Sequence, residues 1–164
     1  MKDEVECGED AAAESQMWLA RAEEFQKAAC SLLGLGREVS APARLCAMTA
    51  IELYLSAFLA HHGVAATGIR KMCHDLAARG AAAAAHGLVL RGRTAAHLAA
   101  MTEAQEYNAL RYRPIVAGSL APANRMAATL REVSEKVSTA IAGRSASLTG
   151  PARPDETGQP AHLS

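Results

Sequence analysis

The stretch SAPARLCAMTAIELYLSAFLAHHG, residues 40–63, decides the fold because it predicts one long apolar helix. Ser40 is a favourable helix cap, and Pro42 is tolerated in the first turn of a helix. Gly63 then ends the apolar pattern, as glycine often does at the end of a helix. We therefore expect a helix from Ser40 to about His62.

The least polar window of the chain, Leu45 to Ile69, overlaps this stretch and is long enough to span a bilayer. Glu52 lies near its centre and His61 and His62 follow, and such residues are costly in lipid. We expect a buried core helix and no membrane segment. The acidic start MKDEVECGED has no apolar core typical of a secretory signal, so we expect a cytoplasmic protein.

One carboxylate falls within the apolar stripe of this helix. The stripe consists of Leu45, Met48, Glu52, Leu55 and Leu59, spaced by three, four, three and four residues. A buried carboxylate needs a partner, so Glu52 predicts a nearby cation. Arg111, which shares a helix face with Asn108, is the first candidate, followed by His74 and Arg70. Alternatively, Glu52 lies at the rim of the bundle and contacts water.

The rest of the chain also favours helices, because alanine is abundant, aromatic residues make up 4% and strand patterns are absent. Apolar stripes predict helices over 11–33, 69–78, 94–110 and from about Pro122 to 142. The alanine run 81–85 lies between two of them and is interpreted as a spacer. The expected fold is an all-α, four- to five-helix up-and-down bundle.

We divide the chain into an acidic N-terminal segment (1–10), a helical bundle (11–142) and a tail (143–164). The tail is rich in Pro, Gly, Ser and Thr and has little to bury, so we expect it to be disordered.

The net charge is zero, but the charges are unevenly distributed. Residues 1–24 hold eight acids and two bases, a net charge of −6, whereas residues 61–125 hold eight bases and three acids, a net charge of +5. The basic region permits a local anion site, although solvated helix faces are the favoured explanation, because like-charged surface patches are common without a ligand. The four cysteines have no metal-ligand spacing, so we expect no metal and no cofactor.

Four short motifs occur in an order that resembles the HEPN family of helical bundles, in its branch with Glu-Leu, His-Asp-Leu and Arg-Tyr motifs. They are FQKAACSLL, LCAMTAIELYLSAFLAHHG, CHDLAARG and YNALRYRP, and they cover about Trp18 to Pro114. One departure is Ser56, where that branch often has lysine. A second is the insertion RGAAAAAHGLVLRGR.

The resemblance implies association with nucleotide or RNA, and a homodimer. The residues that it implicates in binding are His74, Asp75, Arg111 and Tyr112, and we add the nearby basic residue Arg70. Glu52 and Asn108 are expected to be structural polar residues. Some members of the family are ribonuclease toxins that are paired with a nucleotidyltransferase-like antitoxin.

The ribonucleases of the family carry an arginine, four to six residues and then a histidine. Arg79 with His86 and Arg91 with His97 both fit this spacing. We prefer Arg91 and His97 as candidate catalytic residues, because Thr94 is placed to cap a helix that presents His97. Histidine would act as general acid or base and arginine would bind the phosphate.

The expected function is a HEPN-like nucleotide- or RNA-associated binding or accessory module. The first alternative is a metal-independent ribonuclease toxin. The second is a protein–protein interaction bundle without a ligand, in which the polar cluster around Glu52 only fixes helix register.

Overall fold

The computed structural model describes residues 2–33, 40–113, 120 and 122–148, and all regular structure in these residues is helical. The helices are α1 (Lys2–Leu33), α2 (Ala41–His61), α3 (Ala66–Lys71), α4 (Leu76–Ala85), α5 (Gly92–Glu103), α6 (Glu106–Tyr112) and α7 (Ala123–Leu148). The all-α prediction is confirmed. The predicted count of four to five helices is wrong for the described residues, which form three long and four short helices.

Helix α2 is the central element, and it begins as predicted. The Ser40 hydroxyl accepts a hydrogen bond from the backbone N–H of Ala43 at 3.4 Å, and Pro42 lies in the first turn. The helix ends at His61, and Gly63 follows two residues later with a φ of 79°, in the left-handed region that glycine adopts without strain. By length and composition α2 is the one described helix that could cross a membrane, but 78% of its most apolar window is buried inside the protein. It is the core helix of the bundle.

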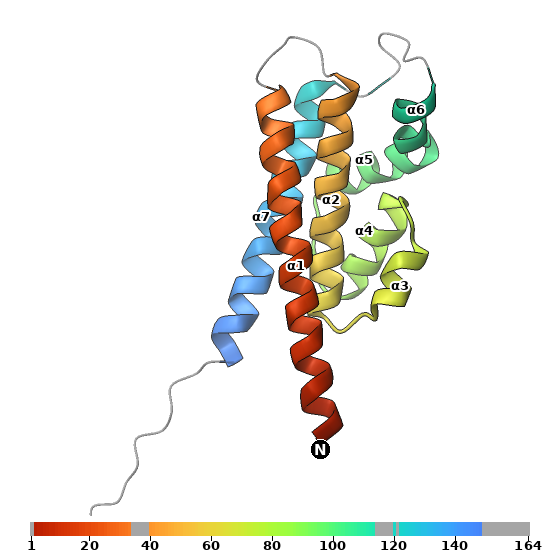
Figure 1. Ribbon diagram of the computed structural model, residues 1–164. Coiled ribbons are helices and arrows are strands. Elements are labelled where there is room, and N and C mark those ends of the chain that lie inside the picture. Colours follow the sequence, from red (N-terminus) through yellow and green to blue (C-terminus); the bar gives the residue numbers. More distant parts are fainter. Residues whose placement is uncertain (1, 34–39, 114–119, 121, 149–164) are drawn as a thin grey trace, which may run out of the picture.

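The other two long helices cover one side of α2, and the short helices cover the other side (Figure 1). Helix α1 runs antiparallel to α2, and the hydroxyl of Ser15 donates a hydrogen bond to the backbone oxygen of Ala57 at 2.9 Å. Many of the buried contacts between the long helices involve alanine, including Ala22, Ala29, Ala47 and Ala50. Because alanine side chains are small, these helices pack closely.

The long helices extend beyond their predicted limits. Helix α1 begins at Lys2, so residues 2–10 continue the helix instead of forming a separate segment. Helix α7 ends at Leu148 and not near residue 142. Residues 143–148 of the predicted tail (143–164) therefore belong to α7, and residues 149–164 lie outside the described residues.

The helix predicted over 69–78 is wrong, because the chain turns between α3 and α4. Cys73 has a φ of 45°, in the left-handed region, and this conformation interrupts the helix. Asp75 then starts α4: its Oδ1 accepts a hydrogen bond from the backbone N–H of Ala78 at 2.8 Å. A carboxylate at this position satisfies a free N–H group of the first turn.

The alanine run is not a spacer, because residues 81–85 form the second half of α4. Ala83 is fully buried, and α4 contacts both α2 and α5. A Cβ atom on Gly80 would lie 3.0 Å from Cδ1 of Leu98 on α5. The absence of a side chain at Gly80 therefore allows α4 and α5 to approach closely.

The helix predicted over 94–110 also divides into two, α5 and α6. Gln105 adopts a left-handed conformation with a φ of 47°, and α6 begins at Glu106. Glu106 is buried and forms an ion pair with Arg44 of α2, which is also buried. This pair fixes the start of α6 against the central helix, because each buried charge requires the other.

Candidate functional site

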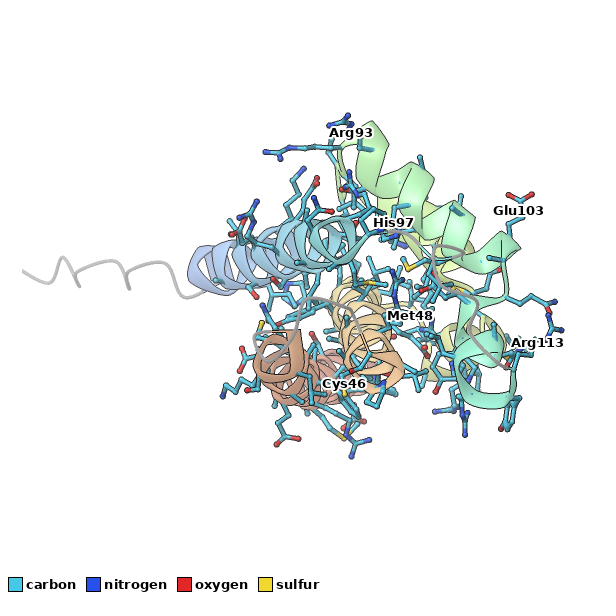
Figure 2. The ribbon with its side chains drawn as sticks, turned by 90° about the horizontal axis from the view of Figure 1, so that it is seen from above. Cys46, Met48, Arg93, His97, Glu103 and Arg113 are labelled. Atoms are coloured by element: carbon cyan, nitrogen blue, oxygen red, sulfur yellow. The ribbon has the colours of Figure 1, made fainter. Side chains whose placement is uncertain are left out.

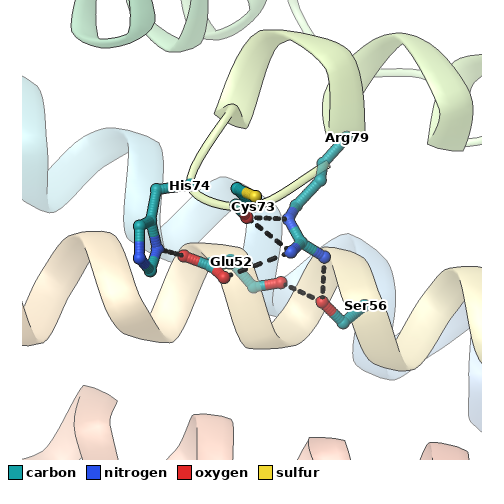
Figure 3. A network of polar contacts seen from close by, with 5 residues as sticks. All are labelled: Glu52, Ser56, Cys73, His74 and Arg79. Atoms are coloured by element: carbon teal, nitrogen blue, oxygen red, sulfur yellow. Dashed lines mark hydrogen bonds and ion pairs between the residues drawn. The ribbon is translucent and has the colours of Figure 1, made fainter. Parts of the chain in front are cut away.

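A polar network joins α2 to the start of α4, and it contains the partners of the Glu52 carboxylate (Figure 3). Nη2 of Arg79 lies 3.2 Å from Oε1 of Glu52, and Nη1 of Arg79 donates to the hydroxyl of Ser56 at 2.7 Å. The same guanidinium donates to the backbone oxygen of Cys73 from Nε at 3.2 Å and from Nη2 at 2.6 Å. Nδ1 of His74 lies 3.0 Å from Oε2 of Glu52.

The expectation that Glu52 needs a cation is confirmed, but the first candidate partner is wrong. Arg79 occupies the place predicted for Arg111, and His74, a second candidate, is the other partner. Burial lowers the pKa of the Arg79 guanidinium and Glu52 opposes this shift. Arg79 remains charged, because the ordinary pKa of arginine is far above neutral. The side chain of Glu52 is 17% exposed, so it is neither fully buried nor simply solvated.

Arg79 also contacts Ser56, the residue that stands where the resembled family branch often has lysine. The Ser56 hydroxyl donates to the backbone oxygen of Glu52 at 2.7 Å and accepts from Arg79. A positive charge therefore lies beside Glu52 even though position 56 is neutral. Arg79 was not among the predicted partners of Glu52, because the helix predicted over 69–78 ended before this residue.

An aromatic and cationic cluster lies beside this network, and we call it the stacked face: His74, Tyr107, Arg111 and Tyr112. The rings of His74 and Tyr107 are stacked, with centroids 3.8 Å apart and planes 14° from parallel. Cζ of Arg111 lies 5.4 Å from the ring centroid of Tyr107 and 5.3 Å from that of Tyr112. Tyr112 is 72% exposed, so one end of the cluster is open to ligands.

A cavity of about 260 Å³ adjoins the stacked face. His74, Asp75, Tyr107 and Asn108 contribute to its wall, together with apolar groups such as Met48. Asn108, expected to be a structural polar residue, is exposed. The carboxylate of Asp75 caps α4 and also faces this cavity.

Arg70 does not join this cluster. It lies in the last turn of α3 and is exposed. Within the described ranges, no hydrogen bond, ion pair or ring contact connects it to the stacked face. The structure therefore brings together four of the five residues predicted to bind nucleotide or RNA, and adds Tyr107.

The candidate catalytic pair lies on α5, apart from the stacked face. Arg91 is the N-cap residue of α5 and its side chain is exposed. His97 is 6% exposed, and its Nδ1 lies 2.8 Å from the hydroxyl of Thr129. Its Nε2 is buried and has no hydrogen-bond partner among the described residues. A general acid or base must reach the substrate, and this imidazole does not reach the surface.

Electrostatics also disfavour an acidic role for His97. Burial lowers the pKa of His97, and the positive charges of Arg125 and Arg44 lower it further. Thr94 does not cap α5, contrary to prediction: its hydroxyl donates instead to Oε2 of Glu132 at 2.6 Å. The imidazole of His97 is therefore neutral at pH 7 and is held in the core between α5 and α7.

The comparisons of this chain with protein-family models, with curated proteins and with solved structures found no match.

Proposed function

We propose that this chain is a HEPN-like binding or accessory module for nucleotides or RNA, and that the stacked face is its binding surface. The observation that carries the proposal is the exposed series of flat groups in which Arg111 lies over the rings of Tyr107 and Tyr112. Unpaired bases bind to such surfaces by stacking on aromatic rings and guanidinium planes. The adjoining cavity supplies hydrogen-bonding groups, Asp75 and Asn108, that could contact the edge of a base.

The ligand would be a nucleotide or a short single-stranded segment. A net charge of zero gives the chain no general attraction to a long phosphate backbone. Stacking tolerates any base, because every base has a π-face, so we expect little sequence preference.

The test is fluorescence anisotropy with a labelled single-stranded RNA of eight or so nucleotides, together with thermal stabilisation by mononucleotides. Tyr112→Ala removes an exposed ring, and Arg111→Gln removes the guanidinium from both rings. Each should weaken binding about 5- to 100-fold, because stacking contributes roughly 1–3 kcal/mol per base. Arg21→Gln, at an exposed arginine of α1, is the matched control and should bind like the parent. Equal binding by the parent, Tyr112→Ala and Arg111→Gln would contradict the proposal.

The ribonuclease alternative has no support in the geometry of Arg91 and His97, because His97 is buried. RNA that remains intact while it binds would favour the accessory module. If neither nucleotides nor RNA bind, the interaction bundle without a ligand becomes the better explanation.

We also propose that the protein is cytoplasmic and, on the family resemblance, that it forms a homodimer and is partnered by a nucleotidyltransferase-like antitoxin. Light scattering after size-exclusion chromatography measures the oligomeric state directly. A monomer at micromolar concentration would contradict the proposed dimer.

A further inference from the structure

A second polar cavity, of about 380 Å³, lies between the start of α5 and helix α7. In Figure 2 the labelled residues Arg93 and His97 mark α5, which lies beside α7. Five basic side chains contribute to the cavity wall: Arg91, Arg93, Arg125, Arg131 and Lys136. Two carboxylates, Glu132 and Glu135, lie among them, so that three positive charges remain in excess.

The carboxylate of Glu132 is already occupied by contacts within the protein. Its Oε1 accepts a hydrogen bond from the backbone N–H of Arg91 at 2.7 Å, and its Oε2 accepts one from Thr94. Nζ of Lys136 lies 3.1 Å from Oε1 of Glu132, so these two charges compensate each other. The backbone N–H of Arg91, at the start of α5, is therefore already satisfied by Glu132.

The four arginines of the cavity have no such compensation. Arg91, Arg93, Arg125 and Arg131 form no ion pair with any carboxylate of the described residues. Nε of Arg125 is buried and has no hydrogen-bond partner in the same part of the chain. A buried donor without an acceptor is costly, and four like charges around one cavity repel one another. An anion in the cavity would relieve the repulsion among these charges.

We infer that this cavity is a binding site for a small oligophosphate, such as inorganic triphosphate or the phosphate chain of a nucleoside polyphosphate. Guanidinium groups match phosphate oxygens with paired hydrogen bonds, and arginine is the preferred residue for this contact. Three excess positive charges favour a ligand with several negative charges, and an oligophosphate carries more of them than orthophosphate. The site is built by α5 and α7 and does not include any residue of the stacked face.

Isothermal titration calorimetry with sodium tripolyphosphate tests the inference on the full chain, with thermal melting as a second measurement. We expect binding that weakens as the salt concentration is raised, because charges near the surface are screened. Arg93→Gln and Arg131→Gln should each raise Kd about tenfold, since a hydrogen bond to a charged group is worth roughly that factor or more. Both side chains are exposed, so the fold, checked by circular dichroism, should be unchanged.

Two comparisons sharpen the test. Glu135→Gln removes the uncompensated carboxylate and should lower Kd several-fold, whereas Arg21→Gln on α1 should leave Kd unchanged. Orthophosphate should bind at least tenfold more weakly than tripolyphosphate, because it engages fewer guanidinium groups.

Absence of both heat and thermal stabilisation at millimolar tripolyphosphate would overturn the inference. So would an unchanged Kd for both Arg93→Gln and Arg131→Gln, or equal affinity for orthophosphate and tripolyphosphate. Tyr112→Ala should bind tripolyphosphate like the parent, so failure at this cavity and failure at the stacked face can be distinguished.

Discussion

The carboxylate of Glu132 on α7 accepts a hydrogen bond from the hydroxyl of Thr94 on α5 at 2.6 Å, and this contact joins two helices that are distant in sequence. Glu132 also accepts a hydrogen bond from the backbone N–H of Arg91. A side chain of α7 thus satisfies a backbone donor at the start of α5. Burial alone would raise the pKa of Glu132, but the bonds from Thr94, Arg91 and Lys136 lower the pKa to about 2.

We predict that Glu132→Gln lowers the free energy of unfolding by about 1–3 kcal/mol at pH 7, because charged hydrogen bonds are lost from a buried site. The folded-state pKa of about 2 lies below the unfolded value of 4.5, so this stabilisation is complete above pH 4.5 and is lost as the pH falls toward 2. Urea midpoints at pH 7 and pH 3 measure both effects. Glu135→Gln on the same helix is the control; an equal loss there would show that Glu132 has no special role.

Arg79 should be essential for stability, because its guanidinium contacts three separate groups at the junction of α2 and α4. We predict that Arg79→Met lowers the free energy of unfolding by about 3 kcal/mol, since Glu52 loses one of its two partners and the backbone oxygen of Cys73 loses its side-chain donor. Glu52→Gln should cost less, about 1–3 kcal/mol, because the amide can still accept a hydrogen bond. Denaturant midpoints decide, and Arg70→Met on neighbouring α3 should have almost no effect. A loss below 0.5 kcal/mol for Arg79→Met, about the size expected at an ordinary surface position, would contradict the structure.

His97 should remain neutral in the folded protein at pH values where ordinary histidines become charged. Its pKa is lowered by burial and by Arg125 and Arg44, so the unfolded chain binds a proton more readily below pH 6.5. Above pH 6.5 the imidazole is neutral in both states and its lowered pKa does not affect the free energy of unfolding. This free energy decreases as the pH falls from 6.5 to the folded-state pKa of His97. NMR titration of the imidazole protons, assigned with His97→Asn, should show a midpoint for His97 below 6.5. A midpoint at or above that value would show that the imidazole is accessible to protons.

At the left-handed turn of Cys73 we predict a substitution that raises stability, whereas the substitutions above lower it. A residue with a Cβ atom is strained at a φ of 45°, and glycine is not. We predict that Cys73→Gly keeps or raises stability by up to about 1 kcal/mol, whereas Cys73→Val, which is β-branched, lowers it by about 1–2 kcal/mol. Thermal melting compares the two variants. Greater stability for Cys73→Val than for Cys73→Gly would mean that the turn is formed differently.

The long helices could be predicted because their signals are local. Ser40 and Gly63 mark the ends of α2 with residues that favour those positions, and α1 and α7 carry regular apolar stripes. The two breaks among the short helices have no such signal. Cys73 and Gln105 adopt conformations that favour glycine, and contacts made by Arg79 and Arg44 with other helices stabilise the neighbouring segments.

The same difference between local signals and contacts among helices explains which parts of the candidate site could be predicted. The burial of Glu52 follows from its spacing in α2, so the need for a cation was predictable. Arg79 could not be identified as that cation, because the residue at which α4 begins determines which side chains reach α2. His74, Arg111 and Tyr112 were found through short motifs. Tyr107 is the first residue of the motif YNALRYRP, but no spacing in the sequence marks it as the stacking partner of His74.

The position of α2 at the centre of the bundle has a consequence for synthesis on the ribosome. Helix α1 is available as soon as α2 emerges, but about 60 residues separate the end of α2 from the start of α7. At 5–20 residues per second, roughly 3–12 seconds pass before α7 can cover its side of α2. During that time the most apolar helix of the chain is accessible to chaperones and to membrane surfaces, so the yield of folded protein should depend on elongation rate as well as on final stability.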